Sequence, residues 1–152
     1  MTGIHGQQRP AQVNTIQFQD YVVYRPNAAT SLPVYGAPIH YTTTVFPKEV
    51  FLDPLNAAYR RFQEKGVSVY FDYAPRNALA LSESSTPEAR LELDRYLREN
   101  LCVPVITELE DSLWDGIYLY GTDNHLSTEG AAIRTQRLIA VLQMQMERDK
   151  IV

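Results

Sequence analysis

The sequence has little to support disulfide, membrane or nucleic-acid chemistry. Its 152 residues include one cysteine, Cys102, so no disulfide forms within the chain and no thiolate metal site is expected. No apolar run approaches the roughly 20 residues that cross a bilayer. Residues 1–12 lack the basic-then-apolar pattern of a signal peptide. A net charge of -4, a pI near 5.3 and the absence of a Lys/Arg cluster argue against a nucleic-acid surface.

The length fits one domain with a hydrophobic core, and the sequence shows no repeat or linker that would divide it. We expect an irregular, proline-rich segment with short strands over residues 1–47, an α/β unit over residues 48–147 and a tail over residues 148–152. Within the first segment, residues 15–24 (TIQFQDYVVY) alternate partly and predict a strand or an extended edge segment. The ten tyrosines fit either a sheet edge or a cleft lining, and composition leaves both open.

A helix followed by a buried strand is predicted in the first half of the α/β unit. Asp53 and Pro54 have the order of an N-cap and a first helical residue. Gly66 suits the residue that follows a helix, and the β-branched and aromatic run 67–73 (VSVYFDY) predicts a buried strand. The expected inner face of the helix carries Leu55, Ala58, Tyr59 and Phe62.

The same order follows a second time. Thr86 and Pro87 predict another helix start, Asn100 its end, and residues 103–107 a short strand. The predicted buried face of this helix carries Ala89, Leu93, Tyr96 and Leu97.

Residues 74–85 form a polar loop at the carboxyl end of the first predicted strand. In open α/β sheets such loops line the ligand crevice. The candidate substrate-binding residues are therefore Asp72, Tyr73, Arg76 and Asn77. Loop capping and solvent contact are the alternative interpretation of these four side chains.

The stretch 121–130 (GTDNHLSTEG) contains the strongest candidates for chemistry. His125 lies just ahead of a predicted helix that begins at Ser127 or Thr128. An imidazole has an unperturbed pKa of about 6.5, which suits proton transfer near neutral pH. Asp123 is placed to orient the ring, as the acid does in a catalytic triad. The alternative is that Asp123 caps a turn and His125 is a surface residue. The last helix is expected to bury Ala131, Thr135, Leu138, Leu142 and Met146.

Three parts of the sequence together resemble the C-terminal half of an SGNH/GDSL-type hydrolase. They are the helix–glycine–strand unit NAAYRRFQEKGVSVYFDYAPRN, the later predicted helix and strand over residues 86–107, and the final block GTDNHLSTEGAAIRTQRLIAVL. The resemblance covers roughly residues 50–145. It implies a three-layer α/β/α sandwich with a short, mostly parallel, flavodoxin-like sheet, with His125 as general base and Asp123 as its orienting acid. It further implies a small ester or an acylated glycan as substrate, no cofactor, and a parent protein that acts outside the cytoplasm.

The sequence departs from this family in two respects. The commoner family pattern places the aspartate three residues before the histidine, where this chain has Thr122. The family's Gly-Asp-Ser motif and its glycine and asparagine oxyanion donors are absent, while Ser82, Ser84 and Ser85 lie in a polar loop. We therefore expect this chain to be the C-terminal piece of a longer hydrolase and to be inactive alone.

Two other functions remain open from the sequence. One is a non-catalytic α/β module that binds a partner or small ligand through tyrosines and the 74–85 loop. The other is a metal site built from His125, Asp123 and His40, for which the distant position of His40 in a proline-rich loop is unfavourable.

Overall fold

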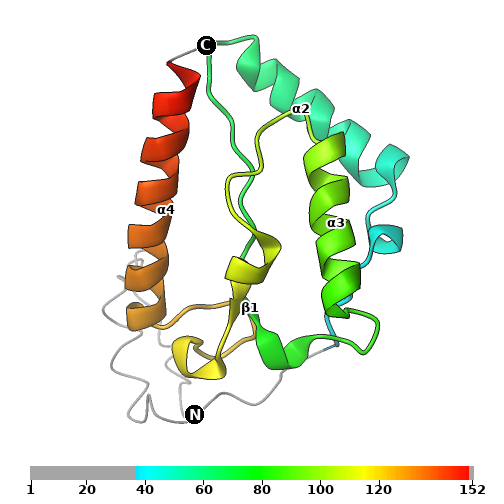
Figure 1. Ribbon diagram of the computed structural model, residues 1–152, viewed down its shortest axis with the longest axis vertical. Helices are drawn as coiled ribbons and strands as arrows, with labels where there is room; N and C mark the ends of the chain where they lie inside the picture. The colour runs from blue at the N-terminus through cyan, green and yellow to red at the C-terminus, as the bar shows by residue number, and fades with distance from the viewer. Residues whose placement is uncertain (1–36, 151–152) are drawn as a thin grey trace, which may run out of the picture.

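The computed structural model describes residues 37–150, in which helices flank a small parallel sheet (Figure 1). The long helices are α2 (Asp53–Gln63), α3 (Pro87–Asn100) and α4 (Thr128–Asp149). Strands β1 (Arg76–Asn77) and β2 (Leu113–Trp114) pair in parallel, with Arg76 opposite Leu113. This is a small α/β domain. The shorter turns of helix are η2 (Thr43–Val45), η3 (Lys48–Leu52), η4 (Ala78–Ala80), η5 (Leu109–Ser112) and η6 (Gly116–Tyr118).

Parallel pairing extends beyond these two strands as single bridges. Phe71 pairs with Val105, and Ile39 pairs with Leu81. The Phe71 N–H donates to the Pro104 carbonyl at 2.9 Å, and the Phe71 carbonyl accepts from Ile106 N–H at 3.0 Å. The predicted strands 67–73 and 103–107 are thus extended segments joined at one bridge. The expectation that the whole first run is buried is wrong at its start, where 47% of Val67 is exposed.

The first α-helix begins within one residue of its predicted start, with Pro54 in its first turn, but the predicted N-cap role of Asp53 is wrong. The π-helix η3 runs directly into α2, so Leu52 and not Asp53 is the flanking residue, and it provides no side-chain cap. The backbone of Asp53 is already helical, and its carboxylate pairs with Lys48 instead of capping the helix. Five helical residues ahead of Asp53 supply the preceding turn, and this makes a side-chain cap at Asp53 unnecessary.

The predicted end of the first helix is confirmed. Gly66 has a φ of 76°, a left-handed conformation that glycine adopts without a side-chain clash. Gly66 N–H donates to the Gln63 carbonyl at 2.9 Å, and Val67 N–H donates to the Phe62 carbonyl at 3.1 Å. These are the two hydrogen bonds of a Schellman ending, which turns the chain from α2 into the following extended segment.

The helix α3 forms as predicted and contributes most to the core. The Thr86 side chain accepts from Ala89 N–H at 3.2 Å, and Asn100 is the last helical residue. Leu93 and Leu97 are buried, while Ala89 and Tyr96 are half-buried. The buried apolar cluster comprises Leu52, Tyr73, Leu93, Leu97, Leu101, Val103 and Leu109.

Side chains along residues 70–73 alternate between two sides of the sheet, as an extended strand requires. Tyr73 donates its hydroxyl to Asp94 of α3 at 2.8 Å. On the other side, Asp72 pairs with Arg134 of α4, and the Tyr70 hydroxyl donates to Asp149 of α4 at 2.6 Å. Figure 1 accordingly shows α2 and α3 on one side of the central extended chains and α4 on the other.

The helix α4 packs less tightly than α3. Gly130 is its one buried residue, and the half-buried positions along its inner side include Ala131, Arg134, Leu138, Val141 and Gln145. The predicted inner positions Thr135 and Met146 are exposed. The predicted positions Ala131, Leu138 and Leu142 are half-buried, and Arg134, which lies outside the prediction, is half-buried where it pairs with Asp72. The helix also continues to Asp149, inside the range predicted as tail.

The buried hydroxyl of Tyr73 yields a test of the α3 side. Burial, together with the hydrogen bond to Asp94, raises the pKa of Tyr73 above its usual range. Tyr73→Phe is expected to lower the free energy of unfolding at pH 7 by about 1–3 kcal/mol, because one hydrogen bond to a carboxylate is lost. Urea unfolding measures this change.

The same substitution changes the pH dependence of stability. A pKa raised in the folded state gives a contribution that is complete below the unfolded pKa of about 10 and is lost as the pH rises above it. Stability should therefore fall above pH 10 by up to about 1.4 kcal/mol per pH unit, and less steeply in Tyr73→Phe. Tyr59→Phe is the control for the loss at pH 7, since the Tyr59 hydroxyl makes no hydrogen bond within residues 37–150. An equal loss at pH 7 in both variants would contradict the assignment.

Candidate functional site

The turn over residues 121–126 lies at the carboxyl ends of the parallel strands, just before α4. Tyr120 N–H donates to the His125 carbonyl at 2.7 Å, and Ser127 N–H donates to the Tyr118 carbonyl at 2.7 Å. Gly121 enters the turn with a φ of 66°. The turn is therefore closed by backbone hydrogen bonds, which place Asp123 and His125 at the start of α4.

A buried contact between Asp123 and Asn77 joins this turn to β1. Asn77 is fully buried, and 8% of Asp123 is exposed. The Asn77 N–H donates to the Asp123 carbonyl at 2.8 Å, and its side-chain amide donates to Asp123 Oδ1 at 3.1 Å. Asn77 Oδ1 accepts from Leu79 N–H at 3.0 Å. Asn77 thus holds both the backbone and the carboxylate of Asp123 against the end of the sheet.

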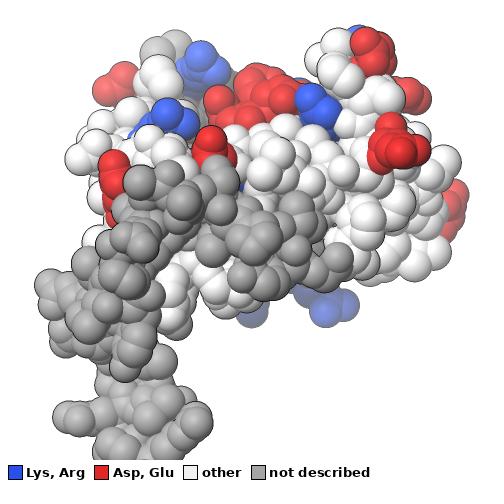
Figure 2. All heavy atoms as spheres, turned by 90° about the horizontal axis from the view of Figure 1, so that it is seen from below, with Lys and Arg blue, Asp and Glu red and all other residues white. Residues whose placement is uncertain are grey.

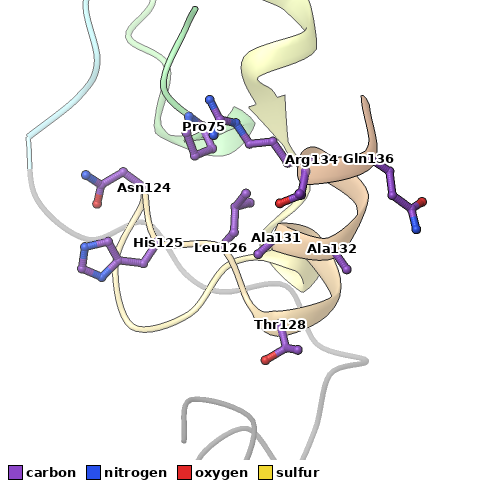
Figure 3. Close-up of a pocket in the computed structure, with 10 residues that line it drawn as sticks. Pro75, Asn124, His125, Leu126, Thr128, Ala131, Ala132, Arg134 and Gln136 are labelled. Carbon is purple, nitrogen blue, oxygen red and sulfur yellow. The ribbon is translucent and has the colours of Figure 1, made fainter. Parts of the chain in front are cut away.

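The imidazole of His125 is exposed and turned away from α4 (Figure 3). Its backbone N–H donates to Thr122 Oγ1 at 3.2 Å, which orders the turn but not the ring. Within residues 37–150 the ring makes no hydrogen bond or ion pair. The structure thus brings Asp123 and His125 into one turn without joining their side chains, and their catalytic roles remain predictions.

An open cavity of about 750 Å³ lies between this turn and the first half of α4 (Figure 3). His125 is at its edge. Pro75, Leu126, Ala131 and Ala132 supply apolar surface, and Thr128 and Thr135 supply hydroxyl groups. Figure 2 shows the end of the molecule that is lowest in Figure 1. Its visible described surface is largely uncharged there, and charged side chains gather toward the margins.

The four candidate binding residues do not converge on one ligand position. Asp72 accepts from Thr107 Oγ1 at 2.7 Å and pairs with Arg134 on the α4 side, whereas Tyr73 points to α3. Arg76 interacts with the Tyr41 hydroxyl, and Asn77 holds Asp123. Each of the four therefore has a partner inside the protein. Ligand contact by these residues remains a prediction.

A cluster of hydroxyl groups lies at the other end of the 74–85 loop. Ser84 Oγ is 3.2 Å from His40 Nδ1, and Ser82 Oγ is 2.9 Å from Ser84 Oγ and 3.1 Å from Ser85 Oγ. Ser85 also donates to the Ile39 carbonyl at 2.8 Å. These contacts join the loop to the segment before η2. His40 thus has a partner away from His125, and residues 37–150 contain no group of three His, Cys, Asp or Glu side chains placed to hold a metal ion.

Sequence reasoning missed two contacts that shape the site. Asn77, a candidate for substrate contact, instead supports Asp123, and Arg134, which the sequence does not mark as a site residue, pairs with Asp72. One signal in the sequence could have indicated the contact of Arg134. Residues four apart share a helix face, so Arg134 lies on the same face of α4 as Gly130.

Comparisons with known proteins identify no relative: no family model, curated protein or solved structure matches the chain. Within residues 37–150, no helix has both the length and the apolar character required to span a bilayer.

The Asn77 contact predicts a large effect on stability. Asn77→Ala removes a donor from a buried carboxylate and breaks the link from the turn to β1. We expect the free energy of unfolding to fall by about 2–4 kcal/mol. Asn124→Ala is the matched control, because Asn124 is exposed and lies in the same turn, and we expect a change within about 0.5 kcal/mol. Urea unfolding of both variants tests this, and similar small effects would exclude a structural role for Asn77.

Gly130 lies where a side chain would meet the backbone of η6. A Cβ added there would lie 2.6 Å from the Tyr118 carbonyl oxygen and 3.0 Å from Tyr118 Cβ. Gly130→Ala is therefore expected to lower stability by about 1–3 kcal/mol, despite alanine's higher helix propensity. Glu129→Ala, at the exposed neighbouring position, is the control. A gain in thermal stability for Gly130→Ala would show that α4 does not approach η6 this closely.

Proposed function

We propose that this chain is the C-terminal part of an SGNH/GDSL-like serine hydrolase in which His125 is the general base and Asp123 orients it. The domain then forms part of a three-layer, flavodoxin-like α/β/α sandwich. The observation that carries the proposal is the position of His125. An accessible imidazole lies in the turn that joins the carboxyl ends of parallel strands to α4, which is the usual place for ligand-binding groups in such sheets.

The proposed chemistry is proton transfer by a neutral imidazole. His125 accepts the proton of an attacking hydroxyl, while Asp123, held by Asn77, provides a fixed carboxylate two residues away in the same turn. Rotation of the His125 side chain toward Asp123 is needed to join the two. The attacking hydroxyl comes from outside residues 37–150 in this proposal, because Ser82, Ser84 and Ser85 bond to one another and to residues 39–41.

The cavity beside His125 supports an acyl group as the part of the substrate bound here. Its walls combine small apolar side chains and threonine hydroxyls with the polar groups of Asn124, Arg134 and Gln136. A short ester or an acylated glycan has an acyl group that suits such walls.

A non-catalytic binding module is the second candidate. It is favoured by the internal partners of Asp72, Tyr73 and Asn77 and by the separation of the His125 ring from Asp123. In this alternative the turn at residues 121–126 only connects β2 and α4.

Slow hydrolysis of an activated aryl acetate separates the two candidates. An accessible imidazole accelerates this reaction even without a serine nucleophile, and a carboxylate that orients the ring increases the rate further. We expect His125→Gln to lower the rate severalfold and Asp123→Asn to lower it in the same direction. His40→Gln, which removes another exposed histidine, should leave the rate nearly unchanged. Equal effects of the two histidine substitutions, with no effect of Asp123→Asn, would support the binding module.

A further inference from the structure

A second cavity lies between α4 and the segments around β2. Its volume of about 420 Å³ is within the range of small-molecule sites. Trp114 of β2 and Arg137 of α4 both line it, and Arg134 lines both this cavity and the one beside the 121–126 turn. The apolar part of its α4 wall consists of Leu138, Ala140 and Val141. The cavity thus combines an apolar wall with an indole ring and a guanidinium group.

Trp114 brings a hydrogen-bond donor to this cavity. Only 6% of the residue is exposed, and its indole Nε1–H is buried without a hydrogen-bond partner in the part of the chain that the structure describes. Tyr118 packs against the indole ring edge-to-face, with the ring centroids 5.8 Å apart, so the position of the ring is fixed without that donor. A buried indole N–H usually has an acceptor. A ligand in the adjoining cavity can supply this acceptor.

Arg137 places a guanidinium group over the same ring. Its guanidinium carbon lies 5.5 Å from the centroid of the Trp114 ring. The side chain makes no hydrogen bond or ion pair within residues 37–150, and the residue is exposed. Arg134, by contrast, is paired with Asp72. The cation–π contact therefore holds Arg137 beside the cavity and leaves its N–H groups for a ligand.

Two carboxylates also line the cavity, and neither balances Arg137. Asp72 is neutralised by Arg134 and accepts a hydrogen bond from Thr107 Oγ1 at 2.7 Å. Asp111 is exposed, so water and salt screen its charge. Among the residues that line the cavity, Arg137 is therefore the charged group that an anionic ligand can pair with.

We propose that this cavity binds a short-chain aliphatic monocarboxylate. The two oxygens of a carboxylate provide acceptors for both donors, the Arg137 guanidinium and Trp114 Nε1–H. The Arg137 side chain is long and exposed, so its guanidinium group can move from the ring face toward the ring edge as the carboxylate enters. The alkyl chain lies along the apolar wall on α4, where its burial adds to the affinity. The proposal is independent of any hydrolase activity.

Titration of the full chain with sodium butyrate tests the proposal. Trp114 is the one tryptophan of the sequence, so a single indole N–H signal in a proton–nitrogen NMR spectrum reports on the site. We expect butyrate to shift this signal saturably, because its carboxylate accepts a hydrogen bond from the indole. Acetate, which is shorter by two CH₂ groups, should bind about tenfold more weakly. Butyramide, which keeps the chain without the charge, should also bind about tenfold more weakly or less well still.

Substitutions locate the binding site. Arg137→Gln should weaken butyrate binding by about tenfold, because a charged hydrogen-bonding partner is lost. Arg148→Gln is the matched control, since it removes the same charge from an exposed position of α4 outside the cavity lining, and it should leave the affinity unchanged. Asp111→Asn should tighten binding, because it removes a like charge. His125→Gln should have no effect, which separates this site from the proposed catalytic turn. The amide signals of α3 report whether each variant is folded.

Three results would overturn the proposal. The first is an indole signal that butyrate does not shift. The second is an equal loss of affinity in Arg137→Gln and Arg148→Gln, which would indicate only a general attraction of anions to the helix. The third is a shift produced by inorganic phosphate at lower concentration than by butyrate, which would show that the apolar wall makes no contribution. A saturable shift that depends on Arg137 and on the length of the alkyl chain, and not on His125, would establish the carboxylate site.

Discussion

The alternation of side chains along residues 70–73 determines how the two sides of this domain are held together. Tyr73 enters the apolar cluster and bonds to Asp94 of α3, while Asp72 reaches Arg134 of α4. The side with α2 and α3 is therefore stabilised by buried apolar area, at about 25 cal/mol per Å². The side with α4 depends more on polar contacts at partly exposed groups, which contribute about 0–1 kcal/mol each. One strand thus supports a well-packed side and a weakly packed side.

This difference affects the candidate site, which adjoins the weakly packed side. The helix α4 alone would fix the 121–126 turn poorly, since Gly130 is its one buried residue. The turn is instead fixed by backbone hydrogen bonds to residues 118 and 120 and by the buried Asn77 contact to Asp123. The close approach of Gly130 to Tyr118 completes this arrangement. The position of His125 therefore depends on β1 and η6 more than on the long helix that follows it.

Much of the local structure was predictable from the sequence, because its causes are local. The Thr86-Pro87 start of α3 and the Gly66 ending of α2 depend on capping and φ preference, and both are confirmed. The N-cap role predicted for Asp53 is wrong because the residues before it are already helical. The inner face of α4 is predicted in part: Ala131, Leu138 and Leu142 are half-buried, whereas Arg134 also faces the sheet because it pairs with Asp72, 62 positions away.

The candidate site was predictable as a location but not as a set of contacts. Spacing alone places Asp123 and His125 in one turn, since two residues in a turn cannot lie far apart. Spacing does not determine which neighbouring group each of the two side chains contacts. Asp123 is buried and bound by Asn77, which precedes it by 46 positions, while His125 is exposed to solvent. A buried carboxylate needs donors, and the sheet supplies one here in place of the imidazole. Pairing of Asp123 with His125 therefore requires the imidazole ring to rotate toward the carboxylate. The hydrogen bond from Asn77 holds that carboxylate in place while the ring moves.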